Sequence, residues 1–316
     1  MSNQRPPVEF SQLGLDTNSF KYSDARSWRG ACPSCGGYRR FVVFTDKQFP
    51  DWNFMCDGCG WKGWAKDLNI NIRQSITEEQ RRKWAQKSAA HEQERITKLE
   101  KTLSEYTRQE VWIATHNYMQ NDNRAWWRAQ GVPDSLQDYW QLGYEKNYTY
   151  NSDSGRMVTP AYTIPYFHHQ SSGDPKFLTI QYRLANTLNP NDRYRFAYGL
   201  RATYYTTEPY QPLNDVCIIC EGAKKAMNVS QIVDPNKYSV IAQPSKSGDY
   251  GVGEAVKNCG RVFVIFDPDG QRNAHDKAKQ IGKAARVVEL NDKVDDMIIA
   301  GRLDERSFEI ALRHAL

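Results

Sequence analysis

Two Cys-x-x-Cys pairs, Cys32/Cys35 and Cys56/Cys59, hold four of the seven cysteines of the chain, with twenty residues between the pairs. Such a turn brings two thiolates within reach of one tetrahedral ion, and two turns complete a closed, structural zinc site. Apolar residues at 41–44 and 52–55 predict short strands between the pairs. The spacing therefore predicts a zinc ribbon with one structural zinc ion. So small a unit is expected to lack a core of its own and to fold on the metal.

A pair of disulfides is the alternative for these cysteines. The first residues, MSNQRPPVEF, contain no apolar stretch of the kind that forms a signal peptide. We therefore expect a reducing, cytoplasmic compartment, in which zinc is favoured over disulfides. No apolar run approaches the roughly 18 residues that a membrane-spanning helix needs, and no membrane partner is expected.

The formal net charge of the chain is only +5, and no segment is a polybasic tail. A nucleic-acid surface must therefore be a local patch rather than a property of the whole chain. One candidate is the stretch 181–201, in which tyrosine and phenylalanine are interleaved with Arg183, Arg193, Arg195 and Arg201. A single strand requires arginines that contact phosphates and aromatic rings that stack on bases. An ordinary amphipathic hairpin is the alternative.

The pattern along the chain changes three times and predicts four parts. Residues 1–75 contain the ribbon. Residues 76–105 open with a capping box at Thr77 and continue as a charged segment without proline or glycine, which predicts a solvated helical linker. Residues 106–214 are expected to form a mixed α+β subdomain, with a hairpin between 159–167 and 176–184. In residues 215–316 apolar runs alternate with helical segments, which predicts an α/β fold with a parallel sheet and flanking helices.

Acidic residues follow three of these apolar runs. Glu221 ends the first, Asp267 and Asp269 follow another, and Asp295 and Asp296 follow the last. Sites in an open parallel sheet form beyond the carboxyl ends of the strands, so neighbouring strands would bring these carboxylates together. Such a cluster repels itself unless cations neutralise it, and oxygen ligands suit Mg2+ or Mn2+, here two ions. The alternative, that the acids are helix caps and loop residues, is favoured for Asp295 and Asp296 taken singly.

These acidic residues and several segments upstream of them resemble a known group of enzymes. Glu221-Gly222 after one strand, and Asp267-x-Asp269 after a strand 46 residues further on, resemble the Toprim fold of DnaG-type primases, topoisomerases and related nucleases. WWRAQGVPDSLQDYWQLGYE and the later TIPYFHHQSSGDPKFLTIQYRLA resemble elements of the primase polymerase core. CPSC and CDGCGWKGWAKDL resemble the N-terminal zinc-binding domain of the same enzymes, including those of phages. The parts stand in the primase order.

The resemblance implies a DNA primase that makes short RNA primers on single-stranded DNA from nucleoside triphosphates, by metal-assisted nucleotidyl transfer. It implies a template-binding domain at 1–75, a helical linker at 76–105, the N-terminal core subdomain at 106–214 and a Toprim catalytic domain at 215–316. Glu221, Asp267 and Asp269 would be catalytic metal ligands or acid/base groups, with Asp295 and Asp296 as further ligands. The arginines of 181–201 would guide template and nucleotide. A replicative helicase would be a further partner, in a bacterial or phage-infected cytoplasm.

Lys225 departs from this pattern, because DnaG-type enzymes usually carry an acid four residues after the Toprim glutamate. A lysine there either removes a metal ligand or contacts a triphosphate. Lys246, in the loop QPSKSGDYG, is a second candidate phosphate contact. The Glu-Gly-x-Lys-Lys form resembles a divergent Toprim subgroup of mobile elements. Two other functions stay open: a Toprim-type nuclease, and a non-catalytic single-strand-binding protein of replication or recombination.

Overall fold

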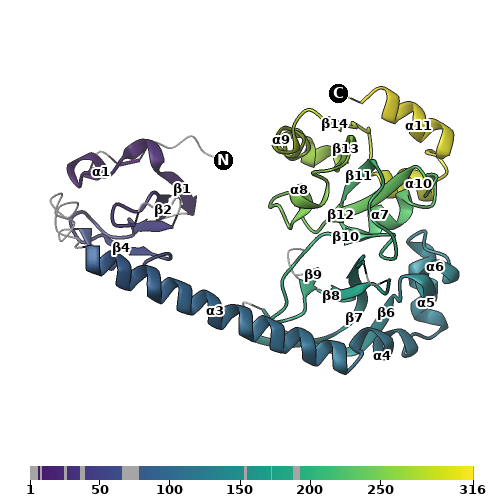
Figure 1. Cartoon of the computed structure of the whole chain (residues 1–316), viewed down its shortest axis with the longest axis horizontal. Coiled ribbons are helices and arrows are strands. Elements are labelled where there is room, and N and C mark those ends of the chain that lie inside the picture. Colours follow the sequence, from purple (N-terminus) through teal and green to yellow (C-terminus); the bar gives the residue numbers. More distant parts are fainter. Residues whose placement is uncertain are drawn as a thin grey trace. The chain divides into compact units, whose positions relative to one another are not determined.

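The structure, a computed structural model, describes residues 6–7, 9–24, 27–35, 40–65, 78–152, 155–171, 173–187 and 193–315. The chain divides into two compact units, Met1–Thr97 and Lys98–Leu316, and each is described by itself (Figure 1). The four parts expected from the sequence, with boundaries after residues 75, 105 and 214, are a finer division that stays a prediction. In the part of the chain that is described, no helix is both long and apolar enough to span a membrane.

The first unit is a five-stranded antiparallel sheet whose strands follow one another in chain order. Its elements are α1 (Glu9–Gln12), the 3-10 turn η1 (Thr17–Ser19), β1 (Lys21–Asp24), β2 (Ser27–Gly30), β3 (Phe41–Phe44), β4 (Asn53–Cys56) and β5 (Lys62–Trp64). Strands β3 and β4 are the two that the sequence predicts between the cysteine pairs, and they pair with each other. The ribbon architecture expected from the cysteine spacing is therefore present.

The expectation that this unit lacks a core of its own is wrong. Aromatic side chains form a buried cluster, with ring centroids 4.9 Å apart in the Phe10–Phe20 pair and 5.2 Å apart in the Phe41–Phe54 pair. The segment before β1 contributes Phe10 and Leu13 to this cluster. The cysteine spacing gave no sign of this, because the contacts join residues that are distant in the sequence.

Helix α3 (Glu78–Arg108) is a single helix of 31 residues, and the boundary between the two units falls within it. The sequence predicts this charged helix, although it ends three residues beyond the linker boundary expected at residue 105. Thr77, the predicted N-cap, lies outside the described residues. The last turns carry Leu103, which packs against buried residues of the second unit. This end of the helix therefore belongs to the second unit.

The second unit begins with short helices and an antiparallel sheet. Its elements are α4 (Val111–Asn117), α5 (Asn121–Ala129), α6 (Asp134–Tyr139), β6 (Gly143–Ser152), β7 (Gly155–His168), β8 (Lys176–Leu184) and β9 (Tyr194–Phe196). The strands lie in chain order, and the β7–β8 pair is the predicted hairpin. Successive side chains of a strand point to opposite faces of the sheet. On one face, Tyr162 and Ile164 of β7 pack in one buried cluster. On the other face, Tyr182 and Leu184 of β8 pack in another.

A second sheet follows, with strand order β10-β12-β11-β13-β14. Its elements are β10 (Tyr205–Thr206), β11 (Val216–Glu221), α7 (Ala223–Val229), β12 (Tyr238–Gln243), α8 (Val252–Ala255), β13 (Arg261–Ile265), η4 (Pro268–Gly270), α9 (Gln271–Ile281), β14 (Ala285–Val287), α10 (Val294–Ile299) and α11 (Glu305–Arg313). β10 is antiparallel to β12, and the other pairs are parallel. This is the predicted parallel sheet.

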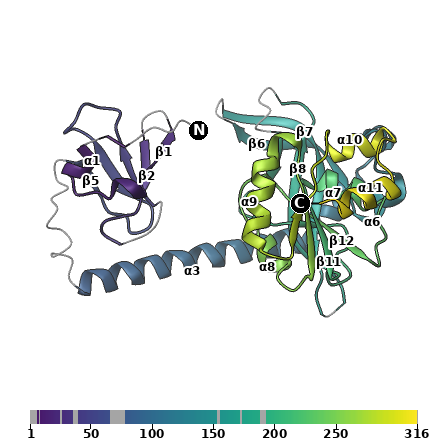
Figure 2. The ribbon, with the colours of Figure 1, turned by 90° about the horizontal axis from the view of Figure 1, so that it is seen from above.

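Helices cover both faces of the parallel sheet. Figure 2 shows α9 on one side and α7, α10 and α11 on the other. Alternate residues of β11 accordingly pack in different clusters: Cys217 and Ile219 with residues of α8 and α9, Ile218 and Cys220 with residues of α7 and α11. The interiors of β11 and β13 are apolar because both faces are buried.

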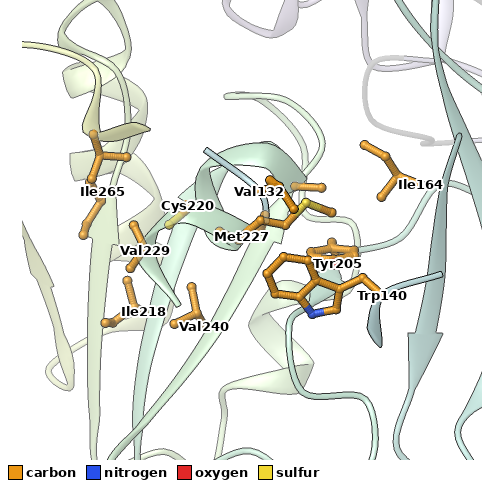
Figure 3. Close-up of a cluster of buried hydrophobic side chains, with 14 of the residues drawn as sticks. Val132, Trp140, Ile164, Tyr205, Ile218, Cys220, Met227, Val229, Val240 and Ile265 are labelled. Carbon is orange, nitrogen blue, oxygen red and sulfur yellow. The ribbon is translucent and has the colours of Figure 1, made fainter. Parts of the chain in front are cut away.

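One core joins the antiparallel and parallel halves of the second unit. Trp140, which precedes β6, packs in the same cluster as Tyr205 of β10 and Met227 of α7 (Figure 3). The indole N–H of Trp140 is satisfied by the carbonyl oxygen of Thr207 at 2.9 Å. This cluster therefore joins the antiparallel sheet to the face of the parallel sheet that α7 covers.

Candidate metal centres

The four predicted zinc ligands converge in the first unit. Cys32 and Cys35 lie in the connection between β2 and β3, Cys56 is the last residue of β4, and Cys59 lies in the turn that follows. Their four sulfur atoms all lie within 4.8 Å of one another. The Cys32–Cys59 Sγ atoms are 3.9 Å apart and the Cys35–Cys56 Sγ atoms 3.8 Å. A tetrahedron with zinc–sulfur bonds of about 2.3 Å has edges of about 3.8 Å, so the cluster has the size that one zinc ion requires.

The chemistry of the four thiols also fits zinc. Burial raises the pKa of Cys32 far above its usual value, and burial raises the pKa of Cys59 to about 11. Thiols in this environment stay protonated near neutral pH unless a cation compensates the charge of the thiolates. A bound Zn2+ supplies that charge, and four sulfur ligands with no open position are typical of a structural site. The cluster is compatible with one structural zinc ion.

The second group of candidate ligands lies at the carboxyl ends of β11 and β13, which are neighbours in the sheet. Glu221 is the last residue of β11, and Asp267 follows β13 by two residues. Gly222 has φ of +85°, which a residue without a side chain adopts readily, and it leads directly into α7. The sharp turn holds Glu221 at the sheet edge, where the sequence predicts a site.

Three lysines pair with the acids at this edge. Lys225 Nζ lies 3.2 Å from Asp267 Oδ2. Lys246 Nζ lies 2.7 Å from Asp269 Oδ2, in a pair that is largely exposed. Lys224 Nζ lies 2.8 Å from Oδ2 of Asp295. The carboxylates that were expected to repel one another are thus partly neutralised by ammonium groups of the chain itself.

Charges around Glu221 and Lys225 interact strongly. Burial raises the pKa of Glu221 and the Asp267 carboxylate raises it further, against the opposing effect of Lys225. Burial acts to lower the pKa of Lys225, but Asp295, Asp267 and Glu221 outweigh it and raise the pKa above its usual value. Lys225 therefore stays charged and lies among three carboxylates.

The acids retain oxygen atoms that could bind a cation. In the part of the chain that the structure describes, Glu221 Oε2, Asp267 Oδ1 and Asp295 Oδ1 are buried and have no hydrogen-bond partner. A methyl group on Gly270 would lie 3.3 Å from Glu221 Oε2, so this glycine leaves room beside that oxygen. Hard carboxylate oxygens are the ligands that Mg2+ and Mn2+ prefer. Among the described residues, however, only the four cysteines bring three or more ligand atoms within 4.8 Å of one another.

The remaining predicted acids and lysines lie further from this centre. Asp269 is in the turn η4 and is exposed, and its hydrogen bond from Lys246 lowers its pKa. Asp296 is exposed on α10, next to the buried Asp295. Asp295 is only 2% exposed at its side chain, so the two neighbouring acids have different environments. The structure brings Glu221, Asp267 and Asp295 together around Lys225, and leaves Asp296 outside.

The arginines of 181–201 do not share one face. In the register of β8 and β9, Arg183 is opposite Tyr194, and Arg195 is opposite Tyr182. Because successive strand residues alternate, Arg183 and Arg195 point to opposite faces. Arg193 and Arg201 are exposed outside the strand. The guanidinium of Arg183 lies 4.6 Å from the ring centre of Trp126, a stacked arrangement that sequence analysis did not identify.

Two residues near the acids were also missed. Lys224 pairs with Asp295. The sequence predicts only that Lys224 lies in a helix, and it does not predict this ion pair. Gln243 ends β12 beside Glu221 in the register, is fully buried, and has an Oε1 atom without a hydrogen-bond partner. A polar residue at the end of an apolar strand was the available signal, the same signal that identified Glu221.

The described parts follow one another as a four-cysteine antiparallel sheet, a second antiparallel sheet and a parallel sheet flanked by helices. The crystal structure of the zinc-binding and RNA polymerase domains of the Aquifex aeolicus primase is similar, with a TM-score of 0.51 at 13% identity, and the match covers 98% of this chain and 83% of that chain. The DnaG catalytic core has a TM-score of 0.51 at 11% identity, with 66% of this chain and 78% of that chain covered. This likeness establishes the fold. No protein-family profile and no curated protein sequence matches the chain.

Proposed function

We propose that this chain is a DNA primase, which synthesises short RNA primers on single-stranded DNA by metal-assisted nucleotidyl transfer. The observation that carries the proposal is the pair Glu221 and Asp267, at the ends of neighbouring strands, each with a buried oxygen that has no hydrogen-bond partner among the described residues. Groups of this kind are found where a cation or a substrate is bound. The primase fold supports the choice of reaction, with residues 215–316 as a Toprim catalytic domain.

In the proposed reaction, the 3′-hydroxyl of one nucleotide attacks the α-phosphorus of the next, a P–O bond forms and pyrophosphate leaves. The attacking hydroxyl gives up its proton to solvent, beside the carboxylates of Glu221 and Asp267. Lys246, on the loop after β12, holds the charge of the departing pyrophosphate. A divalent cation bound by Glu221 and Asp267 would neutralise charge at the phosphorus and make the hydroxyl more acidic.

The other parts of the chain would position the template. Residues 1–75 bind single-stranded DNA, residues 76–105 link them to the core, and residues 106–214 form its N-terminal subdomain. Arg183 contacts the template from its stacked position over Trp126. Nucleoside triphosphates are the second substrate, and a replicative helicase in a bacterial or phage-infected cytoplasm is a further partner.

Primer synthesis tests the proposal. The zinc-loaded full chain is incubated with single-stranded DNA of varied sequence, Mg2+ or Mn2+, and labelled nucleoside triphosphates. Oligomers are expected from the unmodified protein, and Glu221→Gln and Asp267→Asn should each reduce synthesis by about a thousandfold or more, since each removes a charge needed in the transition state. Glu254→Gln is the matched control, because Glu254 is an exposed acid on α8, and it should retain synthesis.

A non-catalytic single-strand-binding protein is the second candidate, and the lysine–carboxylate pairs favour it, because they neutralise acids without a metal. It predicts DNA affinity that is independent of Mg2+ and no oligomers on any template. Cleavage of DNA in the same mixtures without nucleoside triphosphates would indicate the Toprim-type nuclease instead. Full synthesis by both Glu221→Gln and Asp267→Asn would show that the acids are not the catalytic groups.

A further inference from the structure

Lys225 occupies the centre of the acidic edge. Its side chain is 15% exposed and that of its partner Asp267 is 13% exposed, so the ion pair is largely withdrawn from water. Asp295 is more deeply buried, and its charge also acts on Lys225. A buried charge is tolerated only where opposite charges and hydrogen bonds compensate it. Lys225 and these carboxylates therefore depend on one another.

Lys225 competes with a divalent ion for Asp267 Oδ2. A Mg2+ ion would lie about 2.1 Å from a ligand oxygen, and the ammonium nitrogen lies 3.2 Å from the same atom. Two cations on one oxygen would repel each other at such short separations. Among the described residues, Asp267 Oδ1 and Glu221 Oε2 have no hydrogen-bond partner. The lysine thus takes one side of the Asp267 carboxylate and leaves the other available.

We propose that the ammonium group of Lys225 takes the place of one divalent cation, so that the acidic edge binds one fewer ion than the same edge with an acid at position 225. Asp295 provides an independent observation, because its side chain is 98% buried, one of its oxygens is paired with Lys224 and the other has no hydrogen-bond partner among the residues that the structure describes. That buried charge is compensated by lysines of the chain. For its catalytic meaning the inference rests on the proposed function.

The Lys225 ammonium group and the bound ion would have different roles in the reaction. An ammonium group neutralises charge, but it does not make a bound hydroxyl acidic as a metal ion does. Activation of the attacking hydroxyl would therefore fall to the single ion between Glu221 and Asp267. Lys225 would instead keep the Asp267 and Asp295 carboxylates charged and in position whether or not an ion is bound.

Counting bound Mn2+ tests the inference without any measurement of activity. The zinc-loaded full chain is titrated with Mn2+ in the absence of nucleotide, and free Mn2+ is followed by electron paramagnetic resonance. Lys225→Asp should bind one ion more per chain than the unmodified protein. Lys257→Asp makes the same charge change at an exposed lysine of the same unit and should bind the unmodified number. Equal numbers in all three proteins would overturn the inference.

A second variant covers the case in which Lys225→Asp fails to fold. Lys225→Met removes the ammonium group and keeps an apolar stem that is one atom shorter, so Mn2+ should enter the position that the ammonium group held. Saturating Mn2+ should then raise its melting temperature by about 5 °C more than it raises that of the unmodified protein. An equal rise in both proteins would overturn the inference. Extra Mn2+ binding without primer synthesis would overturn only the proposed function, and synthesis with equal Mn2+ counts would overturn only the role of Lys225.

Discussion

Removal of zinc should unfold the first unit and leave the second intact. Structural zinc contributes roughly 10–16 kcal/mol of binding free energy in small zinc domains. A core in a unit of this size rarely contributes more than about 3–5 kcal/mol, even with the aromatic cluster around Phe10 and Phe41. The metal term is two to five times the core term on these figures. A core of this kind rarely supports so small a unit by itself, so the metal-free unit should be unfolded at 25 °C, whereas none of the four clustered cysteines belongs to residues 98–316.

Hydrogen exchange can localise this effect. After chelation, confirmed by metal analysis, amides in β3 and β4 should lose their protection, and amides in β11 and β13 should keep it. Cys56→Ser should reproduce the loss without chelator, because it removes one of four ligands. Cys259→Ser is the matched control, since Cys259 is outside the cluster and lies in the second unit. Full protection of β3 and β4 in metal-free protein would show that the aromatic core folds the unit by itself.

The same site should respond to pH in a defined direction. Zinc binds thiolates, so each thiol that is protonated in the metal-free protein releases its proton on binding. Burial raises the pKa of Cys59 to about 11, and that thiol is therefore protonated throughout the neutral range. Zinc affinity should fall as the pH is lowered, and a competition titration against a chelator at pH 6 and pH 8 would measure the fall. An affinity that does not change between these values would contradict the raised pKa.

Three further predictions concern the second unit. Gly143→Ala should cost about 2–4 kcal/mol in a denaturant titration, because the new methyl would lie 2.5 Å from Thr163 Oγ1; a cost below about 1 kcal/mol would contradict the contact. Glu221→Gln should raise the melting temperature at pH 7 without divalent cations, since burial raises the pKa of Glu221 and its ionised form therefore costs stability above the unfolded pKa of about 4.3. That gain should disappear as the pH falls below about 4.3. A lower melting temperature of Glu221→Gln at pH 7 would instead show that hydrogen-bond donors stabilise the ionised Glu221 carboxylate. Arg183→Lys should weaken single-stranded DNA binding about 3–10-fold at constant salt, because it keeps the charge and loses the stacking on Trp126; unchanged affinity would place the template elsewhere.

Much of this architecture could be predicted because it depends on local sequence patterns. The apolar runs that form β11 and β13 identify their own ends, so Glu221 and Asp267 could be placed at a sheet edge before their neighbours were known. The cysteine spacing identified the ribbon for the same reason. Local pattern also separates Cys217 and Cys220, because residues three apart in a strand point to opposite faces of the sheet. In the structure the two thiols pack in different clusters.

The features that escaped prediction depend on tertiary contacts. Lys246 follows β12 and Asp269 follows β13, two strands that flank β11, and only this strand order brings the charges to 2.7 Å. Arg183 and Arg195 look like one patch in the sequence, but strand register separates them. Phe10 joins the ribbon core from a segment outside the cysteine pairs. Composition carries no information on register or on which loops meet, so charge pairing at the site could not be inferred.

The pattern of pairing at the acidic edge bears on whether the site is functional. Four carboxylates, of Glu221, Asp267, Asp269 and Asp295, meet three ammonium groups, which leaves one negative charge for a cation to neutralise. A site that had lost its function would gain stability by satisfying its buried oxygens, since each unpaired group costs about 1–3 kcal/mol. Glu221 Oε2 and Asp267 Oδ1 instead stay unpaired while the lysines bind the other oxygens of the cluster. Such a retained cost is expected where a ligand repays it, so the partial neutralisation argues for a single-cation site rather than for a decayed one.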